Sequence, residues 1–171
     1  MTALVTERLE LVPWSARLCQ LALEDRPALA EAITARVPEE WPQADFGRIL
    51  PMIRELAESV PGQDLPNFLT IHRQDRCLIG GIGFTRPPAD GEGEFGYDVI
   101  PSYQRQGYAT EMGRAVVSWA FRELGLSCVR ATCQRDNLAS VRVLEKIGLR
   151  RVEETADLVS WLLTRSEWRS S

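Results

Sequence analysis

One continuous stretch, residues 93–133, limits the folds open to this chain more than any other. It begins with GEFGYDVI, residues 93–100, and ends with SCVRATC, residues 127–133, and both segments are typical of strands. Between them, apolar side chains recur at the spacing of one helix face: Met112, Ala115, Val116, Trp119 and Ala120. A helix that connects two strands of one sheet in this way makes the strands parallel. The stretch therefore predicts a β-α-β unit within an α/β (α+β) fold.

Shorter alternating segments supply the rest of the expected sheet. They are residues 7–13, 67–73, 77–86, 149–154 and 157–164. Helical composition covers residues 15–36, with a break at Asp25–Pro27, residues 44–59, which contain Pro51, and residues 137–148. Because residues 67–73, 77–86 and 93–100 follow one another through short turns, we expect an antiparallel meander. The whole sheet should then be mixed and mostly antiparallel.

Three further details of these segments are testable. Helical spacing predicts two apolar faces, one formed by Ile49, Ile53, Leu56 and Val60 and one by Leu138, Val141 and Leu144. Gly148 is expected to end the second of these helices. The glycines Gly80, Gly81 and Gly83 within one strand predict a bulge or a close approach of another backbone.

Composition narrows the classes of function. The chain has 171 residues with no linker or repeat, so one domain over residues 1–171 is expected. A net charge of -4 gives no support for a nucleic-acid binder, which needs a basic face. No apolar run approaches the ~20 residues of a membrane span, and the N-terminal segment does not resemble a signal peptide. The four cysteines then predict reduced, buried thiols in a cytoplasmic protein, and a single histidine without any C-x-x-C pair predicts no metal site.

The loop QRQGYA, residues 104–109, lies where the strand meets the helix. First-turn N–H groups and the helix dipole favour an anion there, Gly107 allows close approach to the backbone, and Arg105 adds positive charge. No acidic residue occurs between Asp98 and Glu111. A plain turn before a helix explains the same residues equally well. The other phosphate motifs are weaker: no P-loop occurs, and the G-x-G-x-x-G match at Gly91–Gly96 leads into a strand and carries two glutamates.

Three motifs in order carry a resemblance to a known family. They are Asp98–Pro101, then Gln104-x-x-Gly107-x-Ala109, then Asn137-x-x-Ser140 ahead of EKIGL, residues 145–149. In this order they resemble the GNAT-type N-acetyltransferases, across nearly the whole chain. The segments GYATE, NLASVRVLEKIGL and DLVSWLLTRSEW are most similar to the branch of ribosomal-protein N-terminal (alanine/serine) acetyltransferases.

The resemblance implies a fold, a donor and its binding residues. The sheet would be flanked by helices and splayed between its fourth and fifth strands, which here are residues 93–100 and 127–133. Acetyl-CoA would be the acetyl donor. Its binding residues would be Val99, Ile100, Gln104, Arg105, Gln106, Gly107, Tyr108, Ala109, Thr110, Asn137 and Ser140. The alternative for Asn137 is a simple N-cap, and it could do both.

Catalysis needs a group for the amine proton and a group for the departing thiolate. Many relatives place a tyrosine where this chain has Leu144. Ser140 is the replacement that the resemblance suggests, with helix capping as its alternative. Glu94 is the candidate base, with a solvated strand-edge glutamate as its alternative. Tyr97 and His72 are weaker candidates.

The expected function is transfer of an acetyl group by direct attack of an amine, a small molecule or a protein N-terminus, on the thioester. An antibiotic or amino-acid acetyltransferase and a non-catalytic acyl-CoA-binding sensor are the alternatives. The acceptor pocket is expected between the first two helices and the loops near Pro87 and Leu158. The closing segment LVSWLLT and Trp168 would serve either a homodimer or the core.

Overall fold

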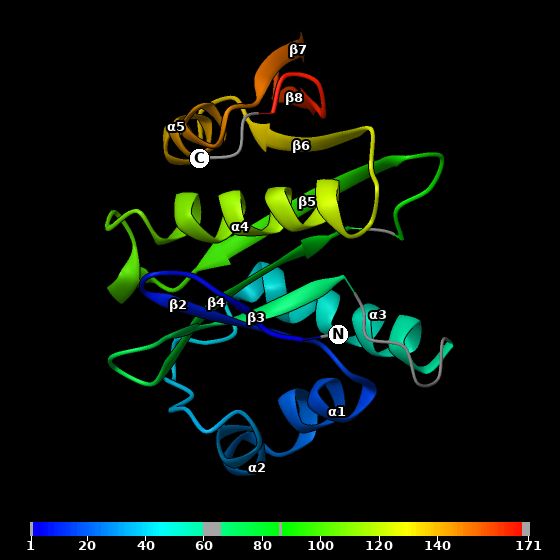
Figure 1. The fold of residues 1–171 in the computed structure, drawn as a ribbon. Coiled ribbons are helices and arrows are strands. Elements are labelled where there is room, and N and C mark those ends of the chain that lie inside the picture. Colours follow the sequence, from blue (N-terminus) through cyan, green and yellow to red (C-terminus); the bar gives the residue numbers. More distant parts are fainter. Residues whose placement is uncertain (1, 60–65, 86, 169–171) are drawn as a thin grey trace. The chain divides into compact units, whose positions relative to one another are not determined.

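The computed structural model describes residues 2–59, 66–85 and 87–168 (Figure 1). The strands in this part are β1 (Leu4–Val5), β2 (Leu9–Pro13), β3 (Asn67–His72), β4 (Cys77–Phe84), β5 (Glu92–Val99), β6 (Cys128–Gln134), β7 (Arg150–Glu154) and β8 (Leu158–Thr164). The helices are α1 (Ala16–Glu24), α2 (Arg26–Ala32), α3 (Ala44–Ser59), α4 (Tyr108–Arg122) and α5 (Leu138–Ile147), with a 3-10 turn, η1 (Pro101–Tyr103), ahead of α4.

The strands form one mixed open sheet in the order β1-β2-β3-β4-β5-β6-β8-β7. β5 and β6 are parallel, as the β-α-β prediction requires, while β2 with β3 and β6 with β8 are antiparallel. The α/β prediction with a mostly antiparallel sheet is therefore confirmed. The two-residue strand β1 was not predicted, because Leu4–Val5 is too short to show an alternating pattern.

Contacts along the chain group into two compact units. The first comprises Met1–Ile82 with Asp98–Tyr108, and the second Gly83–Tyr97 with Ala109–Ser171. Both β4 and β5 contribute residues to each unit. The expectation of one domain over residues 1–171 stays a prediction.

In the first unit, the alternating apolar residues of the sequence are buried in the structure. Leu9 and Leu11 of β2 are fully buried, and β2 pairs with β3. Ser15 caps α1, and Asp25 caps α2 by accepting the N–H of Ala28 at 3.0 Å. Helix α1 packs against both α2 and α3.

The expected apolar face of α3 is only partly correct. Ile53 is buried, but Ile49 is 41% exposed and the adjacent Leu50 is buried instead. The buried face is thus shifted toward Leu50, which shares a face with Ile53 at i, i+3. Val60 and the side chain of Leu56 lie outside the described part of the chain.

In the second unit, α4 and α5 follow the expected helical period with small shifts. Met112, Val116 and Ala120 of α4 are fully buried, as expected. On α5, Val141 and Leu144 are buried, whereas Leu138 is 61% exposed because it lies in the first turn, ahead of the buried face. Asn137 caps α5 at its start. At its end Gly148 adopts a left-handed conformation at φ 112°, as predicted for the helix stop.

The glycines of β4 mark a close backbone approach. A Cβ on Gly80 would lie 2.1 Å from the carbonyl oxygen of Asp98, a separation that no side chain tolerates. The prediction made from these glycines is confirmed at this position. The absence of a side chain at Gly80 lets the end of β5 pack directly on β4.

Candidate active site

The loop between β5 and α4 presents main-chain N–H groups at a helix start. Gln104 closes η1 by donating its N–H to the carbonyl of Pro101 at 3.2 Å, and α4 begins at Tyr108. Arg105 and Gly107 both have positive φ, 63° and 87°. The first-turn N–H groups of α4 have no acceptor within the helix, so they and the dipole favour an anion at this point.

Several side chains of this loop form hydrogen bonds within the protein. The Gln104 amide donates to the carbonyl of Val99 at 2.8 Å, and the Gln106 amide donates to the carbonyl of Ser102 at 3.3 Å. The Tyr108 hydroxyl is 3.1 Å from Nε2 of His72, and both rings are more than nine-tenths buried. These residues can therefore meet a ligand through their main chain, whereas the Arg105 side chain is exposed.

His72 is held on both ring nitrogens. Its Nδ1 accepts the N–H of Asp75 at 3.2 Å, while Nε2 meets Tyr108. This arrangement fits a structural histidine that fixes the start of α4. Nδ1 also lies 3.1 Å from a carboxylate oxygen of Asp75.

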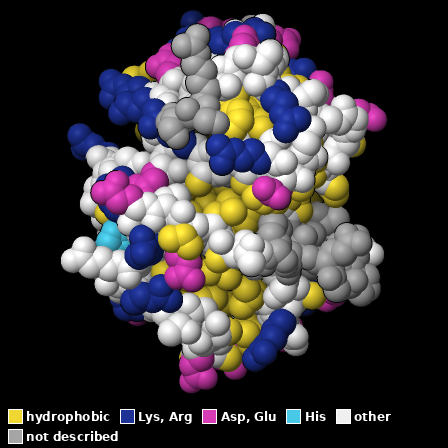
Figure 2. Space-filling view, viewed as in Figure 1, with side chains coloured by type: hydrophobic (Ala, Val, Ile, Leu, Met, Phe, Trp, Pro, Cys, Tyr) yellow, Lys and Arg dark blue, Asp and Glu magenta, His cyan; other side chains and the backbone are white. Residues whose placement is uncertain are grey.

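An arginine distant in sequence reaches the same loop. Arg8 donates to the carbonyl of Gln106 at 3.1 Å, and its guanidinium lies 4.4 Å from the centre of the Tyr108 ring. Beside it opens a cavity of about 790 Å³ in the first unit, whose lining includes Val5, Glu7, Glu10, Arg73 and Arg76. Basic and acidic side chains are intermixed on the face drawn in Figure 2, with the single histidine in cyan among them. No sequence motif marked Arg8, because 98 residues separate it from its partner.

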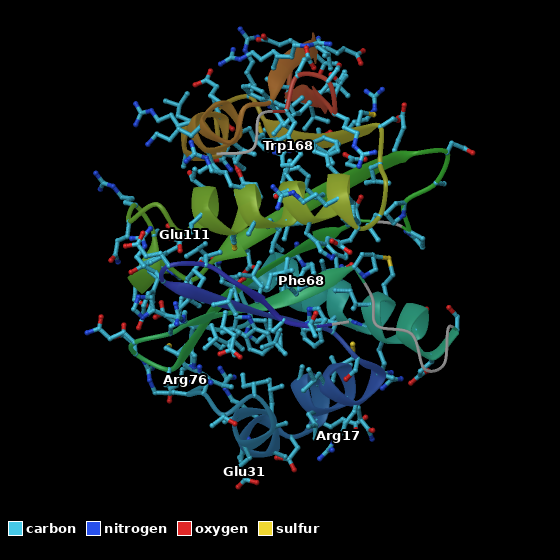
Figure 3. The ribbon with its side chains drawn as sticks, in the orientation of Figure 1. Arg17, Glu31, Phe68, Arg76, Glu111 and Trp168 are labelled. Carbon is cyan, nitrogen blue, oxygen red and sulfur yellow. The ribbon has the colours of Figure 1, made fainter. Side chains whose placement is uncertain are left out.

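The loop has no acid of its own, but the fold brings one to its start. The carboxylate of Glu40 accepts the hydroxyl of Ser102 and also its N–H, the latter at 3.3 Å. The first acid after the loop is Glu111 in the first turn of α4, where the dipole favours negative charge (Figure 3). Residues 99–110 thus contain no acidic residue, as the sequence showed, but in the structure Glu40 lies against the start of the loop.

At the end of β5, successive residues direct their main-chain groups to opposite sides. Ile100 donates its N–H to Ile79 at 2.8 Å and accepts the N–H of Tyr103 at 3.0 Å, so both of its main-chain groups are used. In an antiparallel ladder alternate residues face the same neighbour, and Val99 therefore faces away from β4. Its carbonyl accepts the amides of Gln43 and Gln104, both at 2.8 Å.

β5 and β6 separate after a short region of pairing. Their register covers only Glu92–Glu94 against Cys128–Arg130, although each strand continues for three or more residues. The predicted splay between these two strands is confirmed. In the second unit it leaves Phe95 and Tyr97 in the part of β5 beyond the pairing with β6.

Glu94 lies at the point of divergence. It is half-buried, and its carboxylate accepts the hydroxyl of Thr132 on β6 at 2.9 Å. The neighbouring cation Arg130 instead pairs with Glu92 at 2.9 Å. A carboxylate that accepts one hydrogen bond from a neutral hydroxyl still has lone pairs that can accept a proton.

The start of α5 brings three predicted or weighed residues together. Asn137 accepts the N–H of Ser140 at 3.0 Å, so the N-cap role given as its alternative is confirmed. The hydroxyls of Ser140 and Tyr97 are 3.1 Å apart. Leu144, one turn further along α5, is only 1% exposed and belongs to the core.

Burial raises the pKa of Tyr97 to about 12, while its hydrogen bond with Ser140 opposes the shift. The phenol is therefore protonated at neutral pH. It can donate or accept a hydrogen bond, but it is a poor candidate for the base. This environment does not support a role for Tyr97 as the base.

Asp98 is a half-buried carboxyl whose environment the sequence did not predict. Desolvation raises its pKa to about 6, opposed by hydrogen bonds from Gln43 and from the N–H of Gly81. The Gly81 bond is 2.8 Å long and ties the end of β5 to β4. The two bonds suit a structural role beside Val99.

A metal-binding cluster and a membrane-spanning helix are both absent from the part of the chain that the structure describes. It contains no group of three or more histidine, cysteine, aspartate or glutamate side chains placed to hold a metal ion. Across the same residues, no helix combines the length and the apolar character that crossing a bilayer requires.

Comparison with known proteins identifies the family. The model of the acetyltransferase (GNAT) domain matches residues 8–150. The chain is 27% identical over 164 residues to the uncharacterized N-acetyltransferase YjdG of Bacillus subtilis, covering 95% of this chain and 98% of that one. It is 40% identical over 90 residues to YnaD of the same organism, also an uncharacterized N-acetyltransferase, covering 53% of each.

Among solved structures, the fold is similar to that of RimL, a ribosomal L7/L12 alpha-N-protein acetyltransferase, in complex with coenzyme A. The TM-score is 0.63 at 17% identity, covering 95% of this chain and 97% of that one. Identity at that level supports a shared fold. The chain belongs to the GNAT acetyltransferase family and is an acetyltransferase.

Proposed function

We propose that this protein is an acetyl-CoA-dependent N-acetyltransferase in which an amine attacks the thioester directly. The observation that carries the proposal is the loop of residues 104–107 running into the first turn of α4. Left-handed Arg105 and Gly107 shape it, and main-chain N–H groups are available beyond it. Acetyl-CoA would supply an activated acetyl group, and the chain's residues would bind and orient it.

The donor's pyrophosphate fits the chemistry of this loop. The N–H groups of Arg105 to Thr110 would donate to phosphate oxygens, and Gly107, which carries no Cβ, allows their close approach. The exposed Arg105 side chain adds a positive charge. Arg8, which braces the carbonyl of Gln106, would keep the loop in the binding shape.

Main-chain groups on the splayed part of β5 would hold the reactive end of the donor. Ile100 is poorly placed for this, because its N–H and carbonyl are already bonded. The carbonyl of Val99 likewise accepts two amides, so the N–H of Val99, on the side away from β4, is the better placed group. An N–H aimed at the thioester oxygen would stabilise the negative charge that develops there. Asn137 would add its side-chain NH₂, since only its oxygen is used in capping α5.

Proton transfer would involve two residues of the second unit. Glu94, fixed by Thr132, would accept the proton of the attacking amine directly or through water. Ser140 would donate a hydrogen bond to the sulfur as its bond to the acetyl carbon breaks. Leu144 cannot take this role, because its side chain has no donor.

The acceptor is a small-molecule amine or a protein N-terminus. The similarity of the fold to a ribosomal-protein acetyltransferase favours the N-terminus as the first class to test. The acceptor pocket near the first two helices, Pro87 and Leu158, the cytoplasmic location and the homodimer stay predictions.

Turnover separates the proposal from its rivals. The purified protein is incubated with acetyl-CoA and a panel of peptides with N-terminal alanine or serine, free amino acids and aminoglycosides. Free thiol and acetylated product are then measured. We expect thiol release that depends on one acceptor class. Acetyl-CoA binding without thiol release from any acceptor would indicate a sensor, and thermal protection by ATP but not by coenzyme A would indicate a nucleotide-binding protein.

A further inference from the structure

Two hydroxyls meet across the splayed part of the sheet in the second unit. Tyr97 belongs to β5 beyond its last pairing with β6, and Ser140 belongs to the first turn of α5. Their oxygens are 3.1 Å apart, although 43 residues separate them in sequence. Both side chains are half-buried, so water competes only partly for this contact.

Either hydroxyl of this pair can donate the hydrogen bond to the other. Burial raises the pKa of Tyr97 to about 12, so its phenol carries a proton at neutral pH and can act as the donor. It has two acceptors on Ser140, the Oγ atom at 3.1 Å and the carbonyl oxygen at 3.5 Å, and Oγ is the nearer. When Tyr97 donates to Oγ, the single proton of Ser140 must point to another acceptor.

We propose that Tyr97 is a positioning residue that directs the Ser140 hydroxyl toward the departing sulfur. This inference rests on the proposed function. As the nitrogen–carbon bond forms, the carbon–sulfur bond breaks and sulfur keeps the electron pair. Ser140 stabilises that charge with a hydrogen bond and keeps its own proton. The proton of the amine leaves to Glu94 or water, and the thiolate is protonated from solvent.

Tyr97 therefore acts through Ser140, and its effect should disappear when the serine is absent. A neutral hydrogen bond of this type corresponds to about a 3- to 10-fold effect on rate. The Tyr97→Phe variant removes one oxygen and keeps the ring. We expect kcat to fall by about 3- to 10-fold, while KM for acetyl-CoA stays within about twofold, because the hydroxyl acts on bond breaking rather than on binding.

A double-mutant cycle tests the coupling. Tyr97→Phe, Ser140→Ala and the double variant are compared for kcat with the acceptor identified in the turnover panel. Tyr97→Phe should have no further effect on the Ser140→Ala background. Tyr103→Phe is the matched control: it also loses a bonded hydroxyl, in this case the one that donates to Asp75, and its kcat should stay unchanged.

The measurements distinguish a failure of the positioning role from a failure of the proposed function. Wild-type kcat in Tyr97→Phe, or effects of the two variants that multiply, would overturn the positioning role while leaving the acetyltransferase intact. Absence of thiol release by the wild-type protein with every acceptor would instead refute the proposed function, and the positioning role with it. Melting temperatures of all variants show whether a rate change reflects loss of folded protein.

Discussion

A glutamate at position 107 tests the anion site at the start of α4. Gly107 is exposed and has φ 87°, and among the described residues a Cβ there would meet only the end of the Arg8 side chain, at 3.5 Å. The change Gly107→Glu therefore adds a negative charge to the loop with little steric conflict. It also forces a side chain into a left-handed conformation, which costs about 1–2 kcal/mol.

The expected loss of affinity follows from Coulomb's law. A carboxylate about 5 Å from a bound phosphate raises the binding free energy by about 1 kcal/mol in bulk water and by about 3 kcal/mol at an effective dielectric constant of 20. Because the loop is exposed, we expect a value toward the lower end. The Kd for coenzyme A should then rise by about 5- to 10-fold.

Gly125 provides a matched control. It lies beyond the opposite end of α4, is exposed and has φ 68°, and a Cβ added there would meet no neighbouring atom of the described residues within 4 Å. Gly125→Glu thus adds the same charge and the same backbone strain away from the loop. Isothermal titration with coenzyme A should show weakened binding only for Gly107→Glu, and melting temperatures should fall by similar amounts in both. Equal affinities for the two variants and the wild type would refute the assignment of the loop.

Three further changes test other parts of the account. Arg8→Ala should raise the Kd for coenzyme A by about 3- to 10-fold through the loss of its bond to Gln106. Arg8→Lys, which keeps the charge, should restore part of the affinity. A titration that finds no loss of affinity in Arg8→Ala would remove Arg8 from the site. Asp98 has a pKa of about 6 in the folded protein against 3.8 ordinarily, so the native state holds a proton that the unfolded chain releases between these values. The free energy of unfolding should then fall by about 1.4 kcal/mol per pH unit across that window. Denaturant titrations of Asp98→Asn should lack this slope, and an unchanged slope would contradict the cause given. Gly80→Ala should destabilise by about 2–4 kcal/mol because its Cβ would collide with the Asp98 carbonyl. Gly96→Ala, whose Cβ would meet only a methyl group at 3.8 Å, should change stability by less than about 1 kcal/mol; similar losses in chemical denaturation would count against the close approach.

Local patterns predicted much of this molecule. The β-α-β unit, the N-cap at Asn137 and the left-handed stop at Gly148 depend on residues within a few positions of one another, so periodicity and capping rules were enough. Periodicity alone fixes the buried face of a helix only to within about one residue. Ile49 and Leu138 were therefore expected to be buried and are exposed.

The features that sequence could not predict depend on contacts between distant segments. Arg8 reaches Gln106, Glu40 reaches Ser102, and Gln43 reaches Val99, each across more than 50 residues. The raised pKa of Asp98 likewise comes from burial, which no local pattern encodes. The contact between Tyr97 and Ser140 belongs to the same class, because sequence patterns point to each residue separately and only the fold pairs them.

The most direct test of the central claim is a titration of the ¹⁵N-labelled protein with acetyl-CoA, followed by the shifts of its amide signals. The largest changes should occur at the amides of Arg105 to Thr110, with smaller changes at Val99 and Asn137, and ATP at the same concentration should leave these signals in place. Shifts that cluster elsewhere in the chain, or saturating binding without any change at residues 105–110, would contradict this claim.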